Sequence, residues 1–347
     1  MQADDGGAMK KRTLGKTGLE LSIIGYGGFH LIEVPRKEAS TLLNTYLDQG
    51  GNYIETAAQY GDGISERKIG EAVSHRRDEF VLATKVKDRT RQGALASLER
   101  SLRNLRTDRV DLFFMHEPQT IEEAKQILAP GGAMEAFEEA KKAGKARFAA
   151  ISGHGRPAGI QYSIENHPYD VLMTGFNYFD RFNFPQSEEE LLPLCRGRGV
   201  GVLGMNRLDH LEQDLAIAEN FTPMAEEEKE ELYRSAPELG RYVCRQCKKC
   251  RGADGFAPYE VFLLEGLFDR QMSDYSVPDP QAYALQERLK YWFDQKDWAR
   301  KEYGKLKQKV DAERDYSQLN MLCSYGIDVD RKLKIANSKL AGDGYLF

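Results

Sequence analysis

The chain has 347 residues, a length that suits two domains or one large α/β barrel with an appended module. With 49 basic and 54 acidic side chains its formal net charge is −5, so we expect no overall attraction to nucleic acid or to an anionic bilayer. No run of about 18 apolar residues occurs, and residues 1–16 lack the apolar core of a signal peptide. We therefore expect a soluble, cytoplasmic protein with neither nucleic acid nor a membrane among its partners.

From residue 20 to about residue 206, short apolar runs alternate with amphipathic stretches, a pattern typical of βαβ units and a parallel sheet. The predicted strands cover residues 21–27, 52–57, 80–86, 110–116, 146–152, 171–178 and 199–205. Apolar residues recur every three or four positions in the stretches between them, and the clearest predicted helices cover residues 36–50, 93–106 and 133–146. No glycine-rich dinucleotide fingerprint follows the first strand, so this spacing predicts a TIM-type (β/α)8-like barrel.

After about residue 222 the composition changes to long, charged, helical stretches, over residues 225–240 and 283–319. We interpret these charge runs as solvated helix faces. The predicted domains are a barrel over residues 9–222 and a helical module over residues 223–347.

Ionisable residues close three successive strands of the predicted barrel: Glu55, Lys85 and His116. Tyr60 follows Glu55 in the next loop. In a TIM barrel the residues at these strand ends meet at the mouth, where the chemistry takes place. Each residue taken singly also has a structural explanation, such as a strand-end lysine or a hydrogen-bonded core histidine.

Together these four side chains suit a reaction in which a hydride reaches a carbonyl carbon while a proton reaches its oxygen. A lysine ammonium within hydrogen-bonding distance favours the phenolate, so we expect Lys85 to lower the pKa of Tyr60 and make it a better proton donor. Glu55 would orient Lys85, and His116 would donate a hydrogen bond to the carbonyl oxygen.

Six stretches resemble the aldo-keto reductase family, in the expected order over about residues 12–180: "LGKTGLELSIIGYGG", "NYIETAAQYGDGISERKIGEAV", "VLATKV", "VDLFFMHEP", "KARFAAISGH" and "FNYFD". The resemblance implies a barrel that binds NADPH across its mouth and reduces a small aldehyde or ketone to an alcohol, or performs the reverse reaction. It also implies Tyr60 as general acid, with Lys85 tuning it and His116 orienting the carbonyl. Glu55 stands where the family has aspartate.

The same resemblance assigns the cofactor contacts. Ser152 would bind the nicotinamide carboxamide, with Asn177 beside it, and Phe176 would stack on the nicotinamide ring where tyrosine is usual. One βα unit after the seventh strand is missing from the pattern, which affects the loops that normally hold the adenosine phosphate. Asn206 and Arg207 are the remaining candidates for that phosphate. The alternative function is therefore a reductase-derived electron-transfer or binding protein that has lost its cofactor.

Three of the five cysteines fall within the seven residues "CRQCKKC", which makes a poor disulfide framework and a better metal site. Some members of the family carry a ferredoxin-like C-terminal module, whose motifs read C-x2-C-x2-C-x3-C-P. We place Cys244, Cys247 and Cys250 in the first motif and Cys323 at the end of the second. The four positions that would then bind one of the two clusters hold no cysteine: Asp254, Glu313, Tyr316 and Leu319. The other set of ligands is complete: Cys244, Cys247, Cys250 and Cys323.

We therefore expect one [4Fe-4S] cluster on these four thiolates, with tetrahedral zinc as the alternative metal. A staple that holds the module together and an electron carrier with a redox partner both remain open. The remaining thiol, Cys195, is interpreted as a buried structural residue. The sequence leaves the substrate, the choice between NADP and NAD, and the oligomeric state undetermined.

Overall fold

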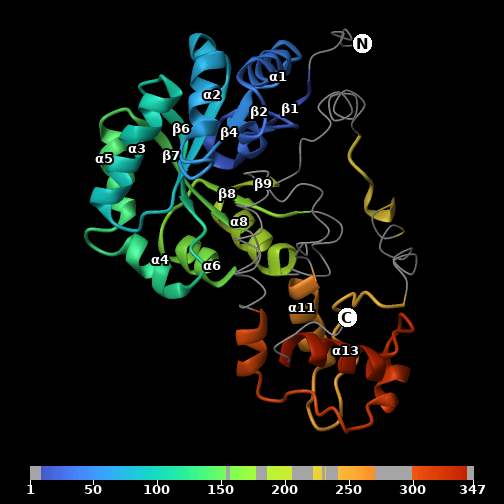
Figure 1. Cartoon of the computed structure of the whole chain (residues 1–347). Helices are drawn as coiled ribbons and strands as arrows, with labels where there is room; N and C mark the ends of the chain where they lie inside the picture. The colour runs from blue at the N-terminus through green and yellow to red at the C-terminus, as the bar shows by residue number, and fades with distance from the viewer. Residues whose placement is uncertain are drawn as a thin grey trace. The chain divides into compact units, whose positions relative to one another are not determined.

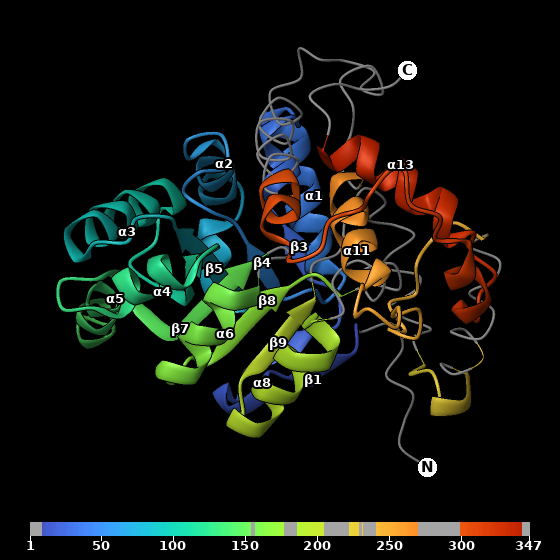
Figure 2. The same ribbon diagram turned by 90° about the horizontal axis from the view of Figure 1, so that it is seen from below.

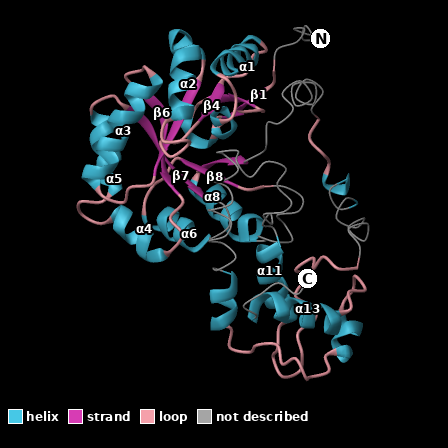
Figure 3. Cartoon of the chain, viewed as in Figure 1, coloured by secondary structure: helices cyan, strands magenta, loops and turns pink. Residues whose placement is uncertain are grey.

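The computed structural model describes residues 9–153, 157–176, 186–204, 222–228, 231, 241–269 and 299–341. The chain divides into two compact units. The first consists of Met1–Asn177 and Gln186–Phe221, and the second of Tyr178–Pro185 and Thr222–Phe347. Figure 1 shows the chain with its elements labelled, and Figure 3 shows the same view by type of secondary structure.

A seven-stranded parallel sheet forms the centre of the first unit. Its strands pair in chain order, as expected when each strand returns beside the previous one through a right-handed crossover. Figure 2 shows the strands curled around one another with the helices outside, which confirms the barrel-like parallel sheet. The strands are β3 (Tyr26–Gly27), β4 (Tyr53–Glu55), β5 (Val81–Val86), β6 (Val110–His116), β7 (Ala146–Gly153), β8 (Val171–Thr174) and β9 (Gly201–Gly204).

The prediction of one continuous first strand over residues 21–27 is wrong. Its first part lies in β2 (Glu20–Ser22), which pairs antiparallel with β1 (Lys11–Thr13) in a separate two-stranded sheet. Its last part, β3, joins the barrel sheet beside β4. Between them the backbone passes close to the ring of Tyr53, where a Cβ on Gly25 would lie only 2.5 Å from a ring carbon. The chain therefore changes direction at a point that admits no side chain.

Helices cover the outer face of the sheet, and the predicted helices over residues 36–50, 93–106 and 133–146 are confirmed as α1, α3 and α5. Thr90 caps α3 by accepting from the backbone N–H of Gly93 at 3.2 Å, as expected for a residue that satisfies a free helix donor. The helices of the first unit are α1 (Arg36–Asp48), α2 (Ile64–Val73), α3 (Arg91–Leu105), α4 (Ile121–Leu128), α5 (Ala133–Lys142), α6 (Pro157–Asn166) and α8 (Leu192–Arg198). Shorter helical turns are η1 (Gly15–Thr17), η2 (Phe29–Ile32), η3 (Ser74–Glu79) and η4 (Ser187–Leu191).

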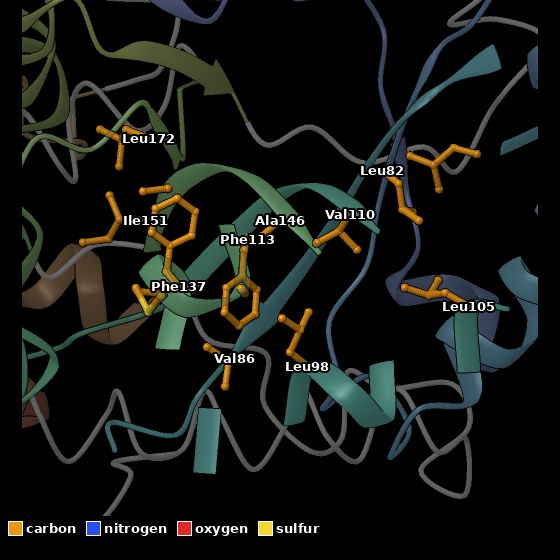
Figure 4. Packing of buried hydrophobic residues seen from close by; sticks show 14 of the residues in the cluster. Leu82, Val86, Leu98, Leu105, Val110, Phe113, Phe137, Ala146, Ile151 and Leu172 are labelled. Carbon is orange, nitrogen blue, oxygen red and sulfur yellow. The ribbon is translucent and has the colours of Figure 1, made fainter. Parts of the chain in front are cut away.

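Side chains alternate between the two faces of each strand, so this unit has two apolar layers, one inside the barrel and one between the sheet and the helices. On β6, Phe113 and Met115 pack outward in the cluster shared with the helices, part of which Figure 4 shows, whereas Leu112 and Phe114 point into the barrel. Full burial of such a side chain contributes roughly 1.5–3 kcal/mol. The same alternation turns His116, two residues after Phe114, toward the interior at the mouth of the barrel.

The second unit contains α11 (Pro258–Asp269), the short helix η7 (Ser317–Leu322) and α13 (Val329–Ala341). The prediction of a helix across residues 283–319 is wrong in the described part: residues 299–305 are helical, and turns and loop follow to residue 316. Tyrosine hydroxyls hold this loop, since the backbone N–H of Val310 donates to Tyr303 Oη at 3.1 Å and that of Asp311 donates to Tyr316 Oη at 2.9 Å.

Two further predictions concern residues outside the described ranges. The missing βα unit would fall within residues 205–221, which the structure does not describe. Most of the helix predicted over residues 225–240 also lies outside the described ranges. Among the helices that the structure does describe, none combines the length and apolarity needed to cross a membrane.

Candidate active site

The ammonium of Lys85 lies at the centre of the predicted site. Lys85 is 2% exposed and reaches the interior from β5. Its Nζ donates to Tyr60 Oη at 2.9 Å and to the carbonyl oxygen of Thr56 at 3.0 Å, and it forms an ion pair with the carboxylate of Glu55. The three donors of the ammonium thus have three partners, which a buried charge requires.

Strand register explains how these groups meet. Glu55 ends β4 and pairs with Ala83 on β5, so Lys85, two residues further along β5, points into the same part of the barrel. Tyr60 lies in the turn between β4 and α2, and its backbone N–H donates to the carbonyl of Ala57 at 3.0 Å. That turn returns the phenol to the strand ends.

His116 and two aromatic contacts complete the surroundings of the phenol. The ring of His116 lies 6.4 Å from the Tyr60 ring, nearly perpendicular to it, and the ring of Phe29 lies edge-on at 5.0 Å. Nδ1 of His116 is 3.1 Å from Oε1 of Gln59, a contact that couples the orientation of this amide to the tautomer of the ring. The sequence prediction included neither Gln59 nor Phe29. For Gln59 the available signal was its place directly before Tyr60 in the same loop.

The prediction that the pKa of Tyr60 is lowered below its ordinary value is wrong for this structure, although Lys85 donates to its hydroxyl. Burial raises the pKa of Tyr60 well above 10, and the carboxylates of Glu55 and Glu117 raise it further. The main physical reason is that burial penalises the charged phenolate; in addition, Glu55 pairs with the same ammonium and offsets part of the charge that would stabilise a phenolate. The phenol therefore stays protonated through the neutral range and is available as a proton donor.

Glu117 is the second carboxylate near the phenol, and the sequence analysis did not predict it. It follows His116 directly, is 5% exposed, and has a positive φ of 50°, a conformation that non-glycine residues seldom adopt. The guanidinium of Arg89 holds this turn by donating to the carbonyl oxygens of His116 at 2.8 Å and of Glu117 at 2.9 Å. Strained backbone of this kind occurs often at functional sites.

Of the predicted cofactor residues, the structure describes two. Ser152 is the register partner of His116 across β6 and β7 and is 2% exposed. Its Oγ has no hydrogen-bond partner among the described residues, which leaves a polar atom for a ligand amide at the barrel mouth. Phe176 is half-buried and follows the end of β8. The other predicted cofactor residues, Asn177, Asn206 and Arg207, lie outside the described ranges.

The four predicted metal ligands all lie in the second unit. Cys244 and Cys323 pack against the same apolar cluster, although 79 positions separate them in the sequence. Burial raises the pKa of Cys250, and the nearby Cys247 and Cys323 raise it further, so these thiols influence one another. Burial also raises the pKa of Cys244, to about 12.

The backbone between these cysteines contains two left-handed residues. Gln246 and Lys248 have positive φ values of 52° and 61°, and the backbone N–H of Gln246 points at Sγ of Cys244 at 3.4 Å. Among the described residues, however, no three Cys, His, Asp or Glu side chains are already grouped closely enough to hold a metal ion. Binding would have to draw the sulfur atoms together and displace their protons.

The positions assigned to the second, missing cluster have other roles. Tyr316 and Leu319 are 1% and 3% exposed and belong to the apolar core, and the ring of Tyr316 lies 5.1 Å from that of Phe256. Asp254 forms an ion pair with Arg314 at 2.6 Å. Two of the positions assigned to a second cluster are therefore filled by packed core side chains, and a third belongs to an ion pair. The buried thiol predicted at Cys195 is confirmed, with 0% exposure on α8.

Comparisons with known proteins agree with this geometry. An uncharacterised oxidoreductase, YqkF, of Bacillus subtilis is 31% identical over 56% of this chain and 63% of its own length. The aldo-keto reductase YhdN of the same organism is 28% identical over 56% of this chain and 61% of its own length. An aldo-keto reductase structure from Klebsiella pneumoniae, solved with NADPH, has the same fold with a TM-score of 0.55 and 20% identity, over 66% of this chain and 96% of that one.

The first curated relatives are each matched over 61–65% of their own length. The model of the aldo/keto reductase family matches residues 23–246, which is more than half of the chain and includes every residue of the proposed catalytic group. The chain belongs to the aldo/keto reductase family.

Proposed function

We propose that this protein is an NADPH-dependent carbonyl reductase that converts a small aldehyde or ketone to an alcohol, or catalyses the reverse reaction. One observation carries the proposal: the buried ammonium of Lys85 joins the carboxylate of Glu55 to the hydroxyl of Tyr60 at the mouth of the barrel. Family membership supports the same reaction.

Each side chain has a distinct part in this proposal. Tyr60 donates its proton to the carbonyl oxygen as negative charge develops there. Lys85 stabilises the phenolate that forms, and Glu55 holds Lys85 in place. His116, held by its contact with Gln59, orients the carbonyl. NADPH, when bound, supplies the hydride.

The described cofactor residues fit a nicotinamide. The free Oγ of Ser152 suits the carboxamide, and Phe176 offers an aromatic face at the end of β8. We propose that Asn177, Asn206 and Arg207 contribute the remaining contacts, with the last two at the adenosine phosphate. A carboxamide bonded to Ser152 would satisfy the one buried hydroxyl of the barrel mouth that lacks a partner among the described residues.

We also propose that the second unit holds one metal centre, a [4Fe-4S] cluster or a zinc ion, through Cys244, Cys247, Cys250 and Cys323. Both centres accept four thiolates, and binding of either would have to draw the four sulfur atoms together. The strained loop and its N–H···S contact support this assignment. Joining segments so distant in the chain would stabilise the unit, and a redox partner is needed only if the centre also carries electrons. A cytoplasmic location would keep the thiols reduced.

Titration of the purified protein with NADPH, followed by assays with a panel of small aldehydes, tests the reductase. We expect saturable quenching of the intrinsic fluorescence and oxidation of NADPH in the presence of an aldehyde. Ser152→Ala should weaken NADPH binding by about two- to tenfold, the effect of one hydrogen bond, whereas Ser101→Ala, a buried serine on α3, should not. Absence of any quenching by NADPH favours the cofactor-free alternative.

A further inference from the structure

A short loop after β3 brings Phe29 to the catalytic phenol. The loop covers residues 28–34 and contains the helical turn η2, in which Phe29 is half-buried. Its start is fixed to the sheet, because the backbone N–H of Gly28 donates to the carbonyl oxygen of Glu55 at 2.8 Å. One turn of 3-10 helix is too short to hold a position by itself, so the rest of the loop needs contacts from outside.

The ammonium of Lys68 provides such contacts at the end of the loop. Lys68 lies on α2, and its Nζ donates to three main-chain carbonyl oxygens. These belong to Leu31 at 2.6 Å, Ile32 at 3.2 Å and Val34 at 2.5 Å. The last carbonyls of a helix have no partner within it and attract a cation, so a charged group with three donors suits this end of η2. An apolar side chain of the same length could replace none of the three bonds.

The first turns of α2 also hold the start of the loop and the turn that carries Tyr60. Ser65, three residues before Lys68 and therefore on the same face of the helix, donates from Oγ to the carbonyl oxygen of Gly28 at 2.7 Å. Its backbone N–H donates to the carbonyl oxygen of Tyr60 at 3.3 Å. One helix thus fixes both partners of the contact between the rings of Phe29 and Tyr60, whose centroids lie 5.0 Å apart.

We propose that Lys68 is a positioning residue of the reductase. By holding the end of the loop, it keeps Phe29 where the apolar group of a carbonyl substrate packs while Tyr60 meets the carbonyl oxygen. The inference rests on the proposed function and adds a residue that touches neither substrate nor cofactor. Aromatic rings favour edge-to-face and offset contacts, so an aromatic aldehyde depends on Phe29 more than a short aliphatic aldehyde does.

Steady-state kinetics of the full-length protein with an aromatic and a short aliphatic aldehyde, such as benzaldehyde and propanal, test the proposal. Lys68→Met keeps the length of the side chain and removes its donors, and Lys37→Met on α1 removes an exposed lysine as a control. We expect Lys68→Met to raise KM for benzaldehyde about two- to tenfold, the effect of one aromatic contact, and to keep KM for propanal and NADPH affinity within about twofold. Lys37→Met should change none of these quantities.

A double-mutant cycle with Phe29→Leu separates positioning from a general effect on the fold. If Lys68 acts through Phe29, adding Lys68→Met to Phe29→Leu raises KM for benzaldehyde no further, whereas independent effects multiply. Thermal unfolding of each variant measures the loss of stability separately. Multiplying effects, an unchanged KM for benzaldehyde, or an equal rise in KM for both aldehydes would overturn the proposal.

If Lys68→Met does not fold, Lys68→Gln, which keeps two donors on a shorter side chain, takes its place in the same cycle. An unsubstituted protein that reduces no aldehyde refutes the proposed function and the positioning role with it. A working reductase whose KM values are independent of Lys68 refutes the positioning role alone.

Discussion

On the proposed function, Lys85→Met should slow carbonyl reduction by about ten- to a thousandfold. At the 2.9 Å that separates Nζ from Tyr60 Oη, a phenolate and an ammonium attract by about 6 kcal/mol at an effective dielectric constant of about 20. Glu55 offsets part of this attraction. The net stabilisation of the phenolate by Lys85 should then equal about 1–3 pKa units, the range seen for opposite charges at short range. These correspond to about 1.4–4 kcal/mol in the transition state.

The assay is single-turnover oxidation of bound NADPH by an aldehyde, measured alongside NADPH affinity. Lys87→Met is a matched control, because Lys87 is exposed and only two residues further along the chain. Lys85→Met should keep its NADPH affinity and lose rate, and Lys87→Met should keep both. If Lys85→Met reduces the aldehyde within twofold of the unsubstituted rate, the ammonium does not stabilise the phenolate and the electrostatic argument fails.

Glu55→Gln removes a carboxylate that raises the pKa of the catalytic phenol, so the alkaline limb of the pH profile for reduction should shift to lower pH by about one unit or more. Alcohol oxidation, which needs the phenolate, should then gain activity at lower pH, and superimposable profiles would contradict this. Gln59→Leu should raise KM for the carbonyl substrate by about two- to tenfold without changing NADPH affinity, because His116 loses one hydrogen bond; unchanged KM would deny that role. Cys323→Ser should lose metal, whereas Cys195→Ser should retain it; equal metal content in both would argue against the ligand set.

The fold could be predicted largely because the barrel alternates its elements regularly. Continuous apolar runs such as residues 112–115 can pack on both faces in a parallel sheet, and the structure has a strand there. The first strand was harder to predict, because the close approach to Tyr53 that redirects the chain at Gly25 depends on tertiary contacts. The charged sequence after residue 305 has a helical pattern, but hydroxyls from Tyr303 and Tyr316 hold it as a loop.

The candidate site likewise contains residues that the sequence predicts and residues that depend on tertiary contacts. Tyr60, Lys85 and His116 could be found because each lies at or near the end of a strand with a recognisable motif. Gln59 had only its place beside Tyr60 as a signal and Glu117 had none, since their contacts depend on a rotamer and on a left-handed turn. The direction of the pKa shift was also beyond the sequence, because it depends on burial and on how the charge of Lys85 is shared.

The role of Tyr60 as proton donor is tested most directly by single turnover of NADPH-saturated Tyr60→Phe, with Tyr162→Phe on α6 as control. The account predicts that Tyr60→Phe binds NADPH with unchanged affinity and transfers hydride to an aldehyde about a hundred- to ten-thousandfold more slowly. Tyr162→Phe should behave as the unsubstituted protein does. A Tyr60→Phe variant that reduces the aldehyde at the unsubstituted rate would contradict the account.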